Sequence, residues 1–218
     1  MTIPAVFVDT CVFKFAATSL PRVIPRAKSL DWGNRSFEVT VHDPVTVNPN
    51  DAIANDELRA EAELLPRLAE LGRVGAVRYL MSVEVLEESL GMPNMDSESG
   101  TFYDAPYEIV SAPLKYSRMM SGSKKKREEH KFNFLASIKH PRFVQLQKVT
   151  GAYQGKLKQS HNQLVDAFHL WCAEHHSCPY FLTLDFKLIK VVGLSPTKSQ
   201  VSLLRPSELL SRIKVPAN

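Results

Sequence analysis

The feature that most constrains the fold of this chain is a set of short apolar runs that end in a carboxylate. Residues 6–8, Val-Phe-Val, lead into Asp9, and residues 180–184, Tyr-Phe-Leu-Thr-Leu, lead into Asp185. Runs of this length, rich in β-branched and aromatic residues, are typical of buried strands. Helical patterns separate them, and strands that alternate with helices predict a parallel sheet. Because the carboxyl ends of such strands meet along one edge, we expect these carboxylates in one place.

The whole chain of 218 residues is expected to form a single α/β domain, with helices on both faces of a central, mainly parallel sheet in a three-layer α/β/α arrangement. Its 44% hydrophobic content is sufficient for a core of that size. We expect strands at 3–9, 77–82, 180–184 and 200–204, and helices at 10–17, 51–71, 83–90, 161–173, 186–191 and 206–213. Pro66 is expected to kink the second of these helices.

Two segments do not fit this alternation. Residues 36–48 alternate between apolar and polar positions around Asp43-Pro44, which predicts a two-stranded hairpin inserted into the fold. Residues 92–160 are too long for an ordinary connection, so we interpret them as an insertion of helices and loops or as a functional lid. Within it, helices are expected at 132–138 and 143–149.

Composition excludes several classes of protein. No run approaches the roughly 20 apolar residues that span a bilayer, and the start of the chain lacks the pattern of a signal peptide. Three cysteines form neither an even framework nor a zinc spacing. We therefore expect a cytoplasmic protein with reduced thiols and no membrane partner. The net charge of +4 permits a nucleic-acid partner without demanding one.

Asp166 is the acidic residue whose surroundings are least ordinary, since residues 164–168 read Leu-Val-Asp-Ala-Phe. A carboxylate among core residues is costly unless it is paired, hydrogen-bonded or bound to a metal. Each of the other acids, taken alone, has a simpler explanation. An aspartate after a strand commonly caps a helix, and the glutamates at 84, 87 and 88 are typical of a solvated helix face.

In their order along the chain, these motifs resemble those of the PIN-domain nucleases. Residues 7–12, Phe-Val-Asp-Thr-Cys-Val, are similar to the opening motif of that family, a strand that ends in Asp followed by Ser or Thr. The remaining motifs are a strand and a helix with a catalytic Glu at 79–88, a helix with an early Asp at 164–168, a strand ending in Thr-x-Asp at 181–185, and a closing strand and helix at 201–210. The segment 36–48 and most of 92–160 fall outside the resemblance.

The resemblance implies a divalent-metal-dependent nuclease that acts on RNA. Its catalytic and metal-binding residues would be Asp9, Glu88, Asp166 and Asp185. Carboxylate oxygens are hard ligands that suit Mg²⁺ or Mn²⁺. Glu88 stands at the family's position, and one residue of slip leaves Glu84 and Glu87 open as alternatives.

Within that expected site, Asp9 is the central ligand, and Glu88 and Asp166 complete the shell of a first ion. Asp185 binds a second ion or holds a water. One metal can activate a water for in-line attack on a phosphodiester, and a second can stabilise the leaving oxygen. The expected supporting residues are Thr10 and Thr183, which orient carboxylates, and Asn162, which holds a water or phosphate or caps its helix.

Positive charge in the long insertion indicates where a substrate could bind. The residues predicted to contact it are Lys124, Lys125, Lys126, Arg127, Lys156, Lys158 and His169. Cations interleaved with aromatic residues suit a single strand whose bases can stack. The alternatives are a plain solvated segment for residues 124–127 and an ordinary, partly buried histidine for His169.

Other functions stay open at this point. The chain could be a catalytically inactive PIN-like module that binds RNA or protein, or a toxin ribonuclease of a toxin–antitoxin pair. A homodimer and an inhibitor protein also remain open as partners. A phosphatase of the haloacid-dehalogenase type likewise opens with a strand that ends in Asp. That chemistry needs a second Asp two residues later, where this chain has Cys11.

Overall fold

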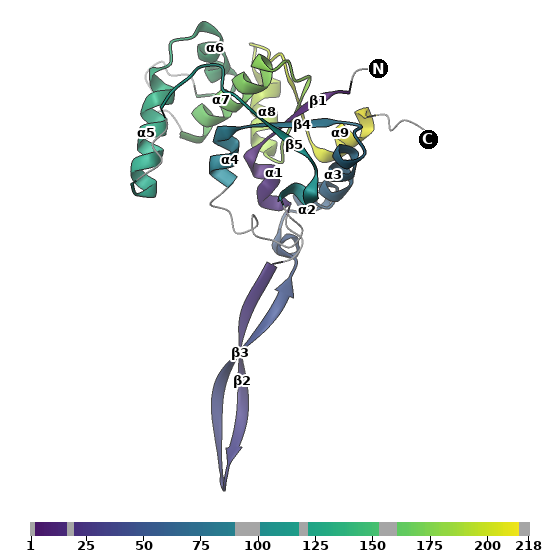
Figure 1. The fold of residues 1–218 in the computed structure, drawn as a ribbon, viewed down its shortest axis with the longest axis vertical. Helices are drawn as coiled ribbons and strands as arrows, with labels where there is room; N and C mark the ends of the chain where they lie inside the picture. The colour runs from purple at the N-terminus through teal and green to yellow at the C-terminus, as the bar shows by residue number, and fades with distance from the viewer. Residues whose placement is uncertain (1–2, 17–19, 90–100, 118–121, 153–160, 214–218) are drawn as a thin grey trace.

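The structure is a computed structural model that describes residues 3–16, 20–89, 101–117, 122–152 and 161–213 (Figure 1). In this part of the chain, five strands form one parallel sheet in the order β5-β4-β1-β6-β7. The strands are β1 (Ala5–Val8), β4 (Arg78–Ser82), β5 (Tyr107–Val110), β6 (Tyr180–Leu182) and β7 (Ser202–Leu204). Helices flank this sheet, so the predicted α/β class with three layers is confirmed.

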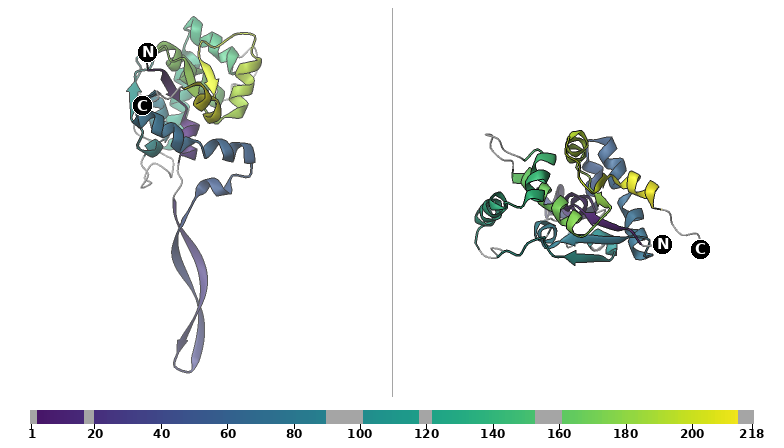
Figure 2. Two further views of the ribbon diagram at one scale, coloured as in Figure 1. Left: turned by 90° about the vertical axis from the view of Figure 1, so that its right-hand side faces the viewer. Right: turned by 90° about the horizontal axis from the view of Figure 1, so that it is seen from above.

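The helices of the described residues alternate with these strands. They are α1 (Thr10–Phe15), α2 (Asp56–Ala62), α3 (Leu65–Arg73), α4 (Val83–Ser89), α5 (Lys124–Ser137), α6 (Pro141–Val149), α7 (His161–His175), α8 (Phe186–Leu194) and α9 (Pro206–Arg212), with 3-10 turns η1 (Pro49–Ala52) and η2 (Thr101–Asp104). Helix α1 packs on α4, α9 on α2 and α3, and both α5 and α6 on α7. Figure 2 shows this body from two further sides.

The core is centred on β1 and α7. Strand β1 pairs with β4 on one side and β6 on the other, and the rings of Phe7 and Phe181 stack across that second pairing at 5.6 Å. Helix α7 is buried from Leu164 to Ala173 at every position except Asp166. The apolar run that surrounds Asp166 in the sequence therefore belongs to the core, and the carboxylate marks the point where α7 meets a polar region.

The predicted helix at 51–71 is two helices, α2 and α3. The Asn55 side chain accepts a hydrogen bond from Leu58 N at 2.9 Å and so caps α2, which begins five residues later than expected. Pro66 lies in the first turn of α3. A backbone N–H at this position would have no partner within the helix, so its absence in proline costs no hydrogen bond. Pro66 therefore begins a helix and does not kink one.

The hairpin differs from its prediction in its bounds. Strand β2 (Leu20–Trp32) pairs with β3 (Arg35–Val47) through 13 antiparallel residue pairs, joined by Gly33-Asn34. Residues 36–47 thus belong to a single strand, and the turn expected at Asp43-Pro44 is absent, since Pro44 pairs with Val23. Proline is tolerated on edge strands, and both strands of an isolated hairpin are edges. The hairpin stands away from the body (Figure 1).

The long insertion contributes more to the fold than expected. Residues 107–110, predicted to lie outside the parallel sheet, form its edge strand β5. Helix α6 starts close to its predicted place, whereas α5 begins at Lys124, eight residues before the predicted start at 132. Leu135 and Phe143 are fully buried, so both helices belong to the core. Parts of the insertion, including Lys156 and Lys158, lie outside the described residues.

No helix in the described ranges combines the length and the apolar character that crossing a bilayer requires. The three cysteines, Cys11, Cys172 and Cys178, all carry free thiols.

Candidate active site

Four carboxylates from four separate segments influence one another at the carboxyl edge of the sheet. Asp9 directly follows β1, Glu88 lies in α4 after β4, Asp166 lies in α7, and Asp185 follows β6. Burial raises the pKa of Asp166 to about 7, and the negative charges of Asp9, Asp185 and Glu88 act in the same direction, against the opposing effect of His169. These four residues are called the acidic cluster below.

Asp9 occupies the N-cap position of α1, yet its side chain makes no capping hydrogen bond. Its Oδ2 instead accepts hydrogen bonds from Thr183 Oγ1 at 2.6 Å and from Cys11 Sγ at 3.0 Å. Burial alone would raise the pKa of Asp9, but His169 and these two donors outweigh it and hold the pKa below its ordinary value. Asp9 is therefore kept ionised and fixed in place, and capping does not explain it.

The hydrogen bonds predicted for the two threonines are both present. Thr183 accepts the backbone N–H of Asp185 at 3.0 Å, which leaves its own hydrogen to donate to Asp9. Thr10 Oγ1 donates to Glu88 Oε2 at 2.7 Å. Each threonine thus orients one carboxylate of the acidic cluster.

Glu88 is the glutamate that reaches the other acids. Its Oε1 is paired with Lys131 Nζ from α5, and both side chains are largely buried. Burial alone would raise the pKa of Glu88, but the charges of His169 and Lys131 and the hydrogen bond from Thr10 lower it. Glu84, one turn earlier, is fully buried and accepts a hydrogen bond from Tyr116 Oη at 2.7 Å. These contacts favour Glu88 over Glu84 and over the half-buried Glu87.

His169 lies between two of the acids. Its Nδ1 is 3.8 Å from Asp9 Oδ1 and its Nε2 is 3.9 Å from Glu88 Oε1. Burial by itself would lower the pKa of His169, but the charges of Glu88 and Asp9 raise it above its ordinary value. The ring is only 1% exposed, so the expectation that His169 contacts substrate does not fit this position. A protonated His169 instead offsets the charge of Asp9 and Glu88.

Asp185 has a second role that sequence reasoning left open. Its Oδ1 accepts the backbone N–H of Leu188 at 2.8 Å and so caps α8. Its charge nevertheless contributes to the raised pKa of Asp166. Asp185 therefore both caps α8 and belongs to the acidic cluster.

Of the residues predicted to bind substrate, His169 lies at the acidic cluster, and the three whose lysine or arginine side chains are described lie on the surface of α5. Lys125, Lys126 and Arg127 are exposed in the first turns of α5, and Arg127 donates to Gly122 O at 2.7 Å. The side chain of Lys124 lies outside the described part of the structure, as do Lys156 and Lys158. Asn162 is exposed in the first turn of α7.

Sequence reasoning missed three members of the site: Cys11, Tyr116 and Lys131. Cys11 has a local signal, because it lies two residues after Asp9 at the start of a helix, where its thiol can turn back to the carboxylate. Tyr116 and Lys131 have none. They reach Glu84 and Glu88 only because the long insertion packs over α4 and α7.

The fit of a metal ion can be judged from the donor set. Among the described residues, no three His, Cys, Asp or Glu side chains converge in a geometry that could hold an ion. The donors themselves, carboxylate oxygens with hydroxyl support, are those that Mg²⁺ and Mn²⁺ prefer. The pKa of Asp166 is raised first by burial, and the negative charges of Asp9, Asp185 and Glu88 add to that effect. The donor atoms therefore suit a hard divalent cation in their chemistry, and binding would require Glu88 to leave Lys131 and the carboxylates to converge.

Fold and site together define a class: an α/β protein with a buried acidic cluster at the carboxyl edge of a parallel sheet. Comparison of the chain with models of protein families, with curated proteins and with solved structures found no match. The resemblance to PIN-domain nucleases therefore rests on the motifs of the sequence.

Proposed function

We propose that this protein is a divalent-metal-dependent ribonuclease that hydrolyses phosphodiester bonds at the acidic cluster. The observation that supports it most is the pKa of Asp166, raised to about 7 by burial and by the charges of Asp9, Asp185 and Glu88. Carboxylates placed this way repel one another, and a bound cation or a proton relieves such repulsion. We propose RNA and not DNA as the substrate because the resemblance to PIN-domain nucleases implies RNA.

In this proposal Asp9, Glu88 and Asp166 hold a first Mg²⁺ or Mn²⁺, and Asp185 holds a second ion or a water. Bound there, a divalent ion would activate a water and neutralise charge on the phosphate. Thr183 and Cys11 keep Asp9 in one orientation, and Thr10 does the same for Glu88. Lys131, once released from Glu88, is a cation at the mouth of the site that can pair with a phosphate oxygen of the substrate.

A catalytically inactive RNA- or protein-binding module is the second candidate. One observation favours it: Lys131 and His169 already offset part of the charge of the cluster, which makes a metal less necessary. For either function we propose a cytoplasmic location, because free thiols such as those of Cys11, Cys172 and Cys178 persist in a reducing compartment.

The test is cleavage of mixed single-stranded RNAs by the purified protein with Mg²⁺ or Mn²⁺. EDTA or Asp9→Asn is expected to reduce the rate at least about 100-fold, since even partners of metal ligands are typically worth 10- to 100-fold. Thr183→Val should lose about 10- to 100-fold and Thr183→Ser should recover most of it. Asp56→Asn, which changes an exposed carboxylate on α2, is the matched control and should be unaffected.

The outcomes separate the two candidates. Cleavage that survives both EDTA and Asp9→Asn excludes the proposed mechanism. If no RNA is cleaved but the protein binds RNA equally well with and without metal, the binding module is the better description. Calorimetric titration of Mg²⁺ and Mn²⁺ into the wild type and Asp9→Asn reads the metal site independently of activity.

A further inference from the structure

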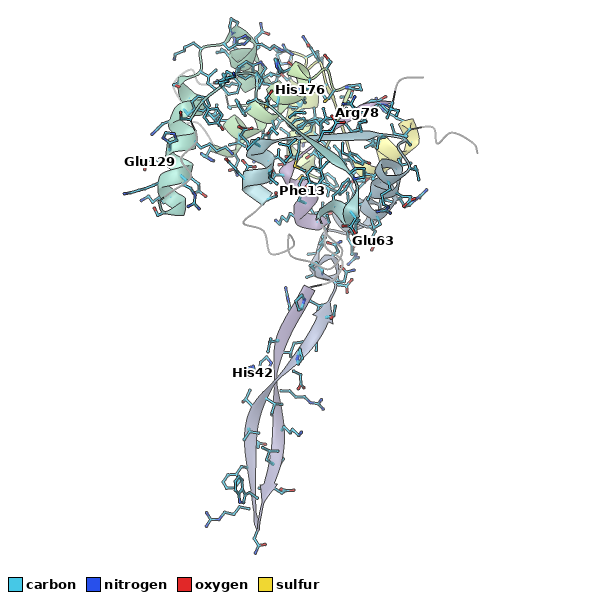
Figure 3. The ribbon with its side chains drawn as sticks, in the orientation of Figure 1. Phe13, His42, Glu63, Arg78, Glu129 and His176 are labelled. Atoms are coloured by element: carbon cyan, nitrogen blue, oxygen red, sulfur yellow. The ribbon has the colours of Figure 1, made fainter. Side chains whose placement is uncertain are left out.

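The β2–β3 hairpin is the largest part of the described structure that the proposed reaction does not use. Each strand has 13 residues, which corresponds to a length of about 43 Å at 3.3 Å per residue. Every side chain from Pro21 to Trp32 is exposed. Figure 3 shows the side chains of the hairpin, including that of His42, apart from those of the body. An isolated two-stranded hairpin is only marginally stable in water, so a ribbon of this length is expected to have a partner.

The register of the hairpin divides its side chains between two faces, because directly opposed residues project from the same face. Arg22 lies opposite Val45, Lys28 opposite Val39 and Trp32 opposite Arg35. One face, called the basic face below, therefore carries Arg22, Ile24, Arg26, Lys28, Leu30, Trp32, Arg35, Phe37, Val39, Val41, Asp43 and Val45. The opposite face carries Pro21, Val23, Pro25, Ala27, Ser29, Asp31, Ser36, Glu38, Thr40, His42, Pro44 and Thr46.

Charge is distributed unequally between these faces. The basic face has four cations and one carboxylate, Asp43, which gives a net charge of +3 from these residues. The opposite face has two carboxylates, Asp31 and Glu38, and no lysine or arginine, which gives −2. The ligand that fits the basic face is therefore a polyanion, and the basic face of a second copy of this chain would be repelled.

Aromatic side chains on the basic face narrow the choice of polyanion. Trp32 is 84% exposed and Phe37 is 50% exposed, both near the tip of the hairpin. Exposed aromatic rings beside a row of cations form a platform on which unpaired bases stack while the cations contact the phosphates. An acidic protein satisfies the charge but gives these rings no comparable partner.

The base of the hairpin is tied to α1, the helix that begins immediately after Asp9. Asn50, just after β3, donates to Phe15 O at 3.2 Å, at the end of α1 that is farther from Asp9. Helix α1 has six residues and is about 9 Å long. A strand that lies along the hairpin is thereby directed toward the body near α1.

We propose that the basic face of the β2–β3 hairpin binds single-stranded RNA and extends the substrate-binding surface of the acidic cluster. The role of the hairpin in holding the substrate rests on the proposed ribonuclease function, whereas the binding of RNA by the hairpin does not. Cations recur along β2 at Arg26 and Lys28, about 7 Å apart, and again at Arg22. The hairpin would therefore hold the backbone of the RNA without reading its sequence.

The binding experiment measures the fluorescence anisotropy of a labelled single-stranded RNA of about 30 nucleotides, longer than the roughly 4–16 nucleotides that one groove covers. EDTA is present so that no cleavage occurs. The variant Arg22→Gln/Arg26→Gln/Lys28→Gln/Arg35→Gln should bind at least about tenfold more weakly, and its slope of log affinity against log salt should fall by up to about 3. Thr40→Ala/Thr46→Ala, on the opposite face of the same hairpin, should leave both quantities unchanged.

The variant Trp32→Ala tests the contribution of base stacking to RNA affinity separately from that of charge. The affinity for the single strand should fall about fivefold or more, with no change in the salt slope, because stacking is not electrostatic. A fully paired RNA duplex of the same length offers no free base face, so its binding should not respond to this substitution. Circular dichroism of each variant verifies that the body remains folded.

Unchanged RNA affinity and salt slope in the four-residue variant would overturn the proposal. If that variant at the same time loses binding to poly-glutamate, the basic face is a site for an acidic protein. Cleavage of a short RNA of about 8 nucleotides, which the acidic cluster can engage without the hairpin, keeps the two proposals apart. If the hairpin variant loses RNA binding but the wild type cleaves no RNA, only the proposed nuclease function is wrong. If the wild type cleaves the short RNA but the hairpin variant binds RNA normally, only the proposed role of the hairpin is wrong.

Discussion

Two inserted segments, the helices α5 and α6 and the β2–β3 hairpin, are added to the body built on the parallel sheet, and they differ in what they bury. Helices α5 and α6 place Leu135, Phe143, Leu146 and Val149 in the core and bring Lys131 to Glu88. The β2–β3 hairpin leaves side chains of the same apolar character in water, with Trp32 84% exposed. The first segment is therefore part of the structure of the site, and the second presents its side chains to solvent.

The difference shows that hydrophobic content alone does not predict which inserted segment joins a core. In α6 the apolar side chains lie on one face of a helix, at Phe143, Leu146 and Val149, and that face has α7 to pack against. In the hairpin Ile24, Leu30, Trp32 and Phe37 share their face with four cations, and burying those cations against an apolar core would be costly.

The largest expected effect compares one phenylalanine from each segment. Phe143→Ala removes a fully buried ring that packs 5.3 Å from Trp171 and should lower the free energy of unfolding by about 3–5 kcal/mol. Phe37→Ala, on the hairpin, should change it by less than about 0.5 kcal/mol. Urea unfolding followed by circular dichroism measures both. Similar losses would mean that the hairpin is stabilised by the body after all.

The next effect concerns the contact that α5 makes with the acidic cluster. Lys131→Ala removes the cation paired with Glu88, so Mg²⁺ or Mn²⁺ should bind about tenfold more tightly, the effect of one nearby charge. Lys125→Ala, an exposed lysine on the same helix, is the control and should change nothing. Isothermal titration calorimetry gives the affinities. Weaker metal binding by the Lys131 variant would show that this lysine does not compete with the ion.

A dependence of stability on pH is expected from the acidic cluster and not from the hairpin. The raised pKa values of Asp166 and His169 mean that the folded state holds these protons more tightly than the unfolded chain does. Their stabilising contributions are complete below their ordinary pKa values and are lost as pH rises through the folded ones. Asp9 and Glu88, whose pKa values are lowered, already contribute fully above about pH 4.5.

In EDTA the Tm should therefore fall as the pH rises from about 4.5 through about 7, the folded pKa of Asp166, and further through the raised pKa of His169, by about 2–4 °C for each kcal/mol lost. Saturating Mg²⁺ should reduce the fall, because a cation favours ionised Asp166. Asp166→Asn should also reduce it, leaving the part due to His169. Differential scanning fluorimetry across this range is the measurement. A Tm that rises over the range in EDTA would contradict the assignment of these two pKa values.

The smallest expected effect is confined to the hairpin. Gly33 has a φ of +61° in the turn, a conformation that costs residues with a Cβ about 1 kcal/mol. Gly33→Ala should speed amide hydrogen exchange along β2 and β3 and leave that of β1 and β6 unchanged, with no measurable shift in Tm. Faster exchange in the body would indicate that the two regions unfold together.

Much of the fold was accessible from the sequence because its buried strands carry continuous apolar runs. β1, β4, β6 and β7 were all predicted within a few residues. β5 was missed because it is an edge strand, where Ile109 is 51% exposed and Glu108 pairs with Arg78, so no buried run marks it. The hairpin was misplaced because its turn was expected at Asp43-Pro44, although Gly33-Asn34 is a two-residue turn signal.

For the site too, some residues could be predicted from the sequence and others could not. The four carboxylates were predicted because each stands in a recognisable motif and the motifs follow one another in a fixed order along the chain. The pairing of Lys131 with Glu88 depends on how α5 packs in three dimensions, and no spacing in the sequence encodes that packing. Sequence reasoning therefore found the acids, gave His169 a contact with substrate in place of its contacts with Asp9 and Glu88, and did not foresee the pairing of Lys131.

The central place of β1 has a consequence for the order in which a newly made chain acquires its parts. Asp9 leaves the ribosome early, but its N–H bonds to Leu182 O at 3.0 Å and its carboxylate to Thr183, both made more than 170 residues later. Such distant partners make this pairing a late event in folding. A ribosome-bound chain would thus carry an unfinished acidic cluster. The proposed RNA-cutting activity would appear only after residues 182 and 183 have been made and have paired with this end of β1.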